Sequence, residues 1–112
     1  MDTMTRRSSG ARCPAEATLL VINGRWKVPL LWHLSKRGTL RFSELRNALN
    51  GVTQKMLTQQ LRELEADGVI SRKVYAQVPP KVEYSLTDTG KSLAPVIQAM
   101  CKWGKRRGKN CQ

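Results

Sequence analysis

Two short segments with helical periodicity, 44–49 and 54–67, lie so close together that they constrain the fold more than any other feature of the chain. Asn50-Gly51-Val52 breaks the chain between them, because glycine adopts turn conformations that other residues resist. A connection this short holds two helices together at a steep angle. The spacing therefore predicts a helix-turn-helix, with a brief extended piece over 39–41 preceding it.

The residues that bound these segments support the same interpretation. Ser43 and Thr53 are typical N-cap residues, and Gly68 is a typical stop after the second helix. Val69–Ala76 and Val82–Thr87 follow as two predicted strands, and apolar and polar residues alternate cleanly in the second. A short tip that contains two prolines joins them. A hairpin directly after the second helix predicts a wing.

Further helices flank this unit. The spacing of apolar residues predicts helices over 14–22, 25–36 and 88–104. Pro29 and Pro95 lie inside the second and third of these, and we expect them to bend the chain there. The predicted fold class is therefore mainly α (α+β), a winged helix-turn-helix with a two-stranded wing and with helices at both ends.

Length and charge limit what such a chain does. A chain of 112 residues supports one compact core. The predicted organisation is a disordered basic tail over 1–12, one domain over 13–104 and a second basic tail over 105–112. A net charge of +12 points to a polyanionic partner, with nucleic acid favoured over an anionic membrane surface. No apolar run approaches the ~18 residues that span a bilayer, and no signal peptide is apparent, so we expect a cytoplasmic protein.

The second helix of the helix-turn-helix offers a set of polar groups suited to reading DNA bases. Its leucines, Leu57, Leu61 and Leu64, recur at helical spacing and must face the core. The opposite arc carries amide, hydroxyl and cationic groups: Gln54, Lys55, Thr58, Gln59 and Arg62. Glutamine forms two hydrogen bonds with adenine, and lysine and arginine favour guanine or phosphate. The acidic residues of this helix crowd its C-terminal end, away from the groove predicted for its first turns. The alternative is an ordinary solvated helix face.

Basic side chains near the predicted turn and wing are candidates for phosphate contacts. Such contacts fix the position of a protein on DNA without reading its sequence. The candidates are Arg41, Ser43, Arg62, Arg72, Lys73 and Lys81. Ser43 and Arg41 also lie at the N-terminus of a predicted helix, where backbone N–H groups attract anions. The alternative for the wing residues is a solvated sheet edge that lysines protect from pairing.

The first and last helices each carry more apolar surface than one small domain buries easily. The candidates for a dimer interface are Leu19, Leu20, Val96, Ile97, Met100 and Trp103. Pairing them between two copies would place two DNA-reading helices about one turn of DNA apart. The alternative is that both helices pack inside one monomer.

Cys13 is the candidate redox sensor. It precedes Pro14 at a helix N-terminus and follows Arg12, and both features favour the thiolate form. The alternative is an unreactive small apolar residue. Cys101 fits a core position, whereas Cys111 lies in the basic tail. The sequence has no closely spaced ligand pair for a metal and no complete nucleophilic set, so we expect no metal, no cofactor and no enzymatic activity.

Several motifs then occur in a fixed order, and together they resemble one family. They are Cys13-Pro14, Gly24-Arg25-Trp26-Lys27, Leu31-Trp32-His33-Leu34, Leu40-Arg41-Phe42-Ser43-Glu44-Leu45, the run over 54–68, Pro79-Pro80-Lys81-Val82-Glu83-Tyr84-Ser85-Leu86-Thr87 and Gly90. Over 13–104 the chain resembles the HxlR-type winged helix-turn-helix regulators of bacteria. The resemblance implies a homodimeric transcription factor, with its terminal helices at the interface and two recognition helices on a palindromic operator. Some members of that family sense oxidants or electrophiles through a cysteine at the position of Cys13. The chain departs from the pattern at Asn50, where many members carry proline, and in its basic C-terminal tail with Cys111.

These observations predict a sequence-specific regulator of transcription, a repressor rather than an activator, with double-stranded DNA and a second copy of the chain as partners. A non-specific architectural DNA-binding protein is the alternative from another class. A winged-helix module that binds protein or membrane is a third interpretation. The operator, the target genes and any small-molecule effector are not indicated by the sequence.

Overall fold

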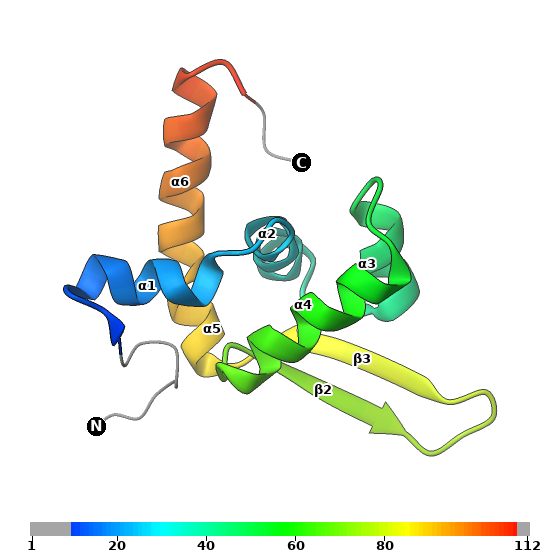
Figure 1. The fold of residues 1–112 in the computed structure, drawn as a ribbon. Coiled ribbons are helices and arrows are strands. Elements are labelled where there is room, and N and C mark those ends of the chain that lie inside the picture. Colours follow the sequence, from blue (N-terminus) through cyan, green and yellow to red (C-terminus); the bar gives the residue numbers. More distant parts are fainter. Residues whose placement is uncertain (1–9, 110–112) are drawn as a thin grey trace.

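The computed structural model describes residues 10–109, and its helices and strands follow the predicted order. The elements are α1 (Pro14–Ile22), α2 (Lys27–Arg37), β1 (Leu40–Arg41), α3 (Phe42–Ala48), α4 (Gln54–Ala66), β2 (Ile70–Tyr75), β3 (Lys81–Leu86), α5 (Asp88–Ser92) and α6 (Ala94–Arg106). Helices α3 and α4 form the helix-turn-helix, and β2 and β3 form the wing that extends from it (Figure 1). The predicted winged helix-turn-helix is confirmed.

Helix α4 begins and ends where its sequence predicts. The Thr53 side chain accepts a hydrogen bond from the backbone N–H of Met56 at 3.1 Å, which satisfies one free donor of the first turn. The helix ends before Gly68, whose φ of +78° is in the left-handed region that favours glycine. These two ends fix which residues of α4 lie on its outer face.

The sheet has three strands instead of the predicted two. Their order is β1-β3-β2, and both pairings are antiparallel. The extended piece predicted over 39–41 forms β1, in which Leu40 is buried opposite Tyr84 of β3. The wing itself has the two predicted strands, β2 and β3, and β1 adds a third strand to their sheet on the other side of β3. A strand of two residues is too short to show an alternating pattern, so its pairing partner was not visible in the sequence.

The helix predicted over 88–104 is interrupted. It forms α5 and α6, which meet at Leu93, and Pro95 lies in the first turn of α6. Proline is tolerated there because a first-turn N–H has no partner within the helix, so Pro95 begins a helix and does not bend one. Pro29 likewise lies in the first turn of α2, because that helix begins at Lys27 and not at residue 25.

Helix α3 begins earlier than predicted, at Phe42. Its N-cap residue is Arg41, and the Glu44 side chain accepts a hydrogen bond from the Arg41 backbone N–H at 2.8 Å. Ser43 therefore lies inside the first turn and is not the N-cap. Its side chain remains exposed.

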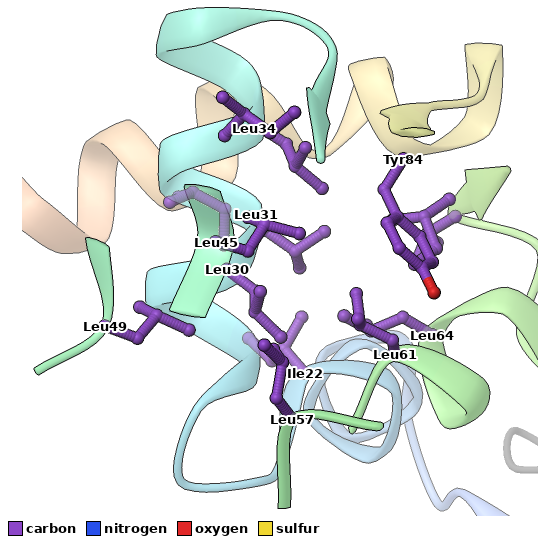
Figure 2. Close-up of a cluster of buried hydrophobic side chains, with 14 of the residues drawn as sticks. Ile22, Leu30, Leu31, Leu34, Leu45, Leu49, Leu57, Leu61, Leu64 and Tyr84 are labelled. Carbon is purple, nitrogen blue, oxygen red and sulfur yellow. The ribbon is translucent and has the colours of Figure 1, made fainter. Parts of the chain in front are cut away.

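The core lies where the helices meet the sheet. Leucines from α2, α3 and α4 converge on one another and on Tyr84 of β3, and Ile22 of α1 packs among them (Figure 2). Leu57, Leu61 and Leu64 of α4 are all at most 2% exposed, as their spacing predicts. Because α4 is held by three buried side chains on one side, its polar side is presented outward as a rigid surface.

Helix α6 extends from the core toward the opposite side of the molecule from the wing tip (Figure 1). It continues through Arg106, two residues into the stretch predicted as a C-terminal tail. Most of the predicted N-terminal tail and Cys111 fall outside the described residues. No helix in the described part of the chain has the length and apolar character needed to cross a membrane.

Candidate nucleic-acid interface

The outer face of α4 gathers all the polar residues predicted for it. Gln54, Lys55, Thr58, Gln59 and Arg62 line one shallow, open depression. It offers amide, hydroxyl and cationic groups and contains no carboxylate. Such a surface matches the donor and acceptor groups of base edges and the negative charge of phosphates.

A second depression joins α4 to the wing. Thr58 and Arg62 line it from α4, and Arg72 lines it from β2. Leu61 and Tyr84 form its apolar part, and the Glu65 carboxylate also lines it. Arg62 and Arg72 therefore lie on one continuous surface with the base-reading candidates, so two of the six predicted phosphate residues are placed beside them.

The sheet separates the remaining wing residues from Arg72. Adjacent residues of a strand point to opposite faces, so Lys73 lies on the face away from Arg72. On that face Arg41 of β1 and Lys73 of β2 both pair with Glu83 of β3, one on each side. Arg72 and Lys73 are neighbours in the sequence, and both are predicted to contact phosphate. Because the strand is pleated, their side chains lie on opposite faces of the sheet.

A compact cluster organises the cations on this second face. Lys73 Nζ and Lys81 Nζ lie 5.0 and 4.6 Å from the centre of the Tyr75 ring. The Tyr75 hydroxyl donates to Glu83 at 2.8 Å, and Lys81 Nζ lies 3.5 Å from the other Glu83 carboxylate oxygen. The Tyr75 hydrogen bond lowers the pKa of Glu83, desolvation opposes it, and the charges of Lys81 and Arg41 add smaller decreases. Sequence analysis missed Tyr75 and Glu83, although their alternation with Lys73 and Lys81 places all four on one face.

A partly buried ion pair joins α4 to α2. Lys27 of α2 is completely buried, and its ammonium group binds the carboxylate of Glu63. Glu63 also accepts a hydrogen bond from the Gln59 side-chain amide at 2.7 Å. Glu63 thus contacts the polar arc of α4 through Gln59, because one helical turn brings residues i and i+4 together.

The apolar residues predicted for a dimer interface differ in how far they are exposed. Leu19 of α1 and Val96, Met100 and Trp103 of α6 are exposed, at 55, 39, 42 and 60%. Leu20 is half-buried. Ile97 is a correction, because it is 1% exposed and belongs to the core of its own chain.

Cys13 is an exposed free cysteine at the N-cap position of α1. The neighbouring Arg12 forms an ion pair with Glu16, with 2.9 Å between Nη2 and Oε2. This contact raises the pKa of Arg12 and lowers that of Glu16. The cation expected to favour a Cys13 thiolate is thus engaged by a carboxylate. Cys101 packs partly buried against the core and is not a free thiol.

Residues 10–109 contain no cluster of three or more His, Cys, Asp or Glu side chains that could hold a metal ion.

Comparison with known proteins assigns this architecture to a family. The family model described as HxlR-like helix-turn-helix matches residues 21–112. The chain is 58% identical over 94 residues to "Uncharacterized HTH-type transcriptional regulator YdeP" of Bacillus subtilis (strain 168), a match that covers 84% of this chain and 73% of that protein.

Solved structures agree with this assignment. "Redoxregulator HypR in its reduced form" has a TM-score of 0.82 at 52% identity, covering 87% of this chain and 95% of that one. The putative HTH-type transcriptional regulator ytcD has a TM-score of 0.79 at 55% identity, covering 85% and 96%. Its sequence and its fold therefore both show that this chain belongs to the HxlR-like helix-turn-helix family of transcriptional regulators.

Proposed function

We propose that this regulator is a sequence-specific repressor that binds a palindromic operator as a homodimer. The observation that carries the proposal is the single outward surface of α4 formed by Gln54, Lys55, Thr58, Gln59 and Arg62. A helix of this kind enters the major groove, where side chains reach the base edges.

The residues divide into two roles. Gln54, Lys55, Thr58 and Gln59 read bases. Arg62 and Arg72 hold phosphates beside them, supported by the depression that both residues line. Arg41, Ser43, Lys73 and Lys81 contact phosphates further along the backbone. The net charge of +12 supports strong, salt-dependent binding.

The apolar residues exposed on α1 and α6 support the homodimer. Leu19, Val96, Met100 and Trp103 are large side chains left in water by the monomer. A two-fold axis through these helices places two copies of α4 on half-sites about one DNA turn apart, which is why the operator is palindromic.

Paired variants test base reading. The probe is a duplex that the wild-type protein selects from a random pool, with unselected DNA as the reference. Gln59→Ala should weaken binding to the selected duplex by ~1–3 kcal/mol and leave binding to random DNA almost unchanged. Arg72→Ala should weaken both alike and reduce the slope of log affinity against log salt by about one. Equal losses for Gln59→Ala on both DNAs would identify a non-specific architectural protein instead.

The proposal includes a thiol response through Cys13. Its support is the exposed free thiol at the start of α1 and the similarity to a protein named as a redox regulator in both oxidised and reduced forms. Diamide should lower the operator affinity of the wild type and leave that of Cys13→Ser unchanged. If the two proteins lose affinity equally, Cys13 is not the sensor.

A further inference from the structure

Gln59 is held by a carboxylate that is itself held by a buried cation. Gln59 Nε2 donates to one oxygen of Glu63 at 2.7 Å, and Lys27 Nζ donates to the other at 2.5 Å. Lys27 lies on α2 and is fully buried, so its ammonium group requires a charged acceptor. The two oxygens of Glu63 therefore have different partners. One accepts from the buried Lys27, and the other accepts from Gln59 on the outer face of α4.

This arrangement fixes the direction of the Gln59 amide. An ionised carboxylate only accepts hydrogen bonds, so the NH₂ group of Gln59, and not its carbonyl oxygen, must face Glu63. The carbonyl oxygen and the second N–H of the amide are then left for a partner outside the protein. The Lys27 ammonium group fixes the direction of the Glu63 carboxylate, although Lys27 itself is buried and lies out of reach of any DNA.

We propose that Glu63 and Lys27 are positioning residues that set the base preference of Gln59 to adenine. The inference rests on the proposed function, because it requires Gln59 to meet a base edge. Adenine presents a donor at N6 and an acceptor at N7 in the major groove, whereas guanine presents two acceptors, O6 and N7. One outward carbonyl oxygen with one outward N–H matches adenine and not guanine.

The ion pair has a second effect on the same surface. Glu63 places a negative charge one turn from Gln59, where phosphates would repel it. Lys27 offsets this charge from inside the protein and contributes no exposed cation that would attract phosphate without regard to sequence. The network therefore orients the amide at little cost in DNA affinity.

A single-atom change should reverse the preference. In Glu63→Gln, the buried Lys27 still requires an acceptor, so the new amide turns its oxygen toward Lys27 and its NH₂ toward Gln59. Gln59 then rotates its own amide to accept that hydrogen bond. Both of its N–H groups become available outward, and two donors match the O6 and N7 acceptors of guanine.

The test is selection of duplexes from a randomised DNA pool by the full chain, followed by sequencing of the bound fraction. The wild type should prefer adenine at one position of each half-site by about 10-fold. Gln59→Ala should lose the preference at that position alone, and this loss identifies the base pair that Gln59 reads. Glu63→Gln should prefer guanine at the same position. Glu65→Gln is the matched control, because it removes the same charge from an exposed residue of α4 and should leave adenine preferred.

The outcomes separate the two proposals. If Gln59→Ala changes the base preference at no position, Gln59 does not read a base, and the inference about Glu63 and Lys27 is wrong as well. If Gln59→Ala erases one position but Glu63→Gln still prefers adenine there, only the positioning role is wrong. Should Glu63→Gln fail to fold by circular dichroism, the double variant Lys27→Met/Glu63→Met removes both charges together. It should bind adenine and guanine equally at that position, and a retained adenine preference would overturn the inference.

Discussion

At the scale of single residues, Glu83 shows how one carboxylate arranges several cations on the wing. Because the Tyr75 hydroxyl donates to it, the pKa of Glu83 is lowered in the folded protein. A lowered folded-state pKa means that the contact stabilises the fold at pH values above the ordinary pKa of 4.5. That contribution is lost as the pH falls through the lowered value.

The Tyr75→Phe variant should show this dependence. Without the hydroxyl, the pKa of Glu83 should move back toward 4.5, because the largest cause of its decrease is gone. The melting temperature should fall at pH 7 and approach that of the wild type once the pH is below the lowered pKa, where Glu83 is protonated in both proteins. An NMR titration of the Glu83 carboxyl group measures the pKa directly. Lys81→Met removes a smaller cause and should move the pKa less; the reverse order would contradict the assignment.

The sequence of α4 predicted which side chains lie on its outer face. It did not predict the ion pair that supports that face from inside the protein. Three leucines at helical spacing determine which side of α4 faces water, so Gln54 and Gln59 follow from the sequence alone. The Lys27–Glu63 pair joins residues that are 36 positions apart. A lysine in a helix is ordinarily solvated, and no local pattern distinguishes the one that turns inward.

At the scale of helices and strands, the first turn of α4 combines a stabilising cap with two of the proposed base-reading residues. The Thr53 side chain caps the first turn, which also carries Gln54 and Lys55. Thr53→Ala should destabilise the protein by about 1 kcal/mol, because a first-turn N–H loses its acceptor. Urea unfolding followed by circular dichroism measures the free energy of unfolding. Thr53→Ser keeps the hydroxyl and should stay close to the wild type, so equal losses in both variants would exclude the cap as the cause.

The bounds of a helix or strand could be predicted where residues close together in the sequence determine them. Helix α4 has a cap, a periodic core face and a terminal glycine, and its predicted bounds differ from the structure by one residue. Strand β1 depends on a partner more than 40 residues away, Tyr84 of β3. The interruption at Leu93 depends on whether Pro95 bends one helix or begins another, and the apolar spacing around it fits both.

At the scale of the whole molecule, the exposed apolar side chains and the proposed DNA-reading surface occupy different regions. The exposed apolar side chains lie on α1 and α6, and α6 projects away from the wing (Figure 1). In the proposed dimer, the polar surface of α4 is therefore free to contact DNA while the terminal helices contact a second copy. With +12 charges on each chain, two copies repel one another, so burial of apolar area would have to supply the association energy of the proposed dimer.

Trp103→Lys should convert the proposed dimer to a monomer. It removes the largest exposed apolar side chain of α6, 60% exposed, and adds a charge to a helix end that is already basic. Sedimentation velocity measures the change in mass. Val74→Lys is the matched control, because Val74 is 53% exposed on the wing and the same charge is added far from α6.

DNA binding by the same variants tests whether the two half-sites are bound by one dimer. A dimer gains from its second half-site because the first holds that site at high local concentration. Trp103→Lys should therefore lose at least about 10-fold in affinity for the full palindrome and bind a single half-site as the wild type does. Val74→Lys should remain a dimer and retain its preference for the full palindrome over one half-site. A Trp103→Lys protein that still sediments as a dimer would place the interface on another surface, whereas a monomer with undiminished affinity for the palindrome would show that the two half-sites are bound independently.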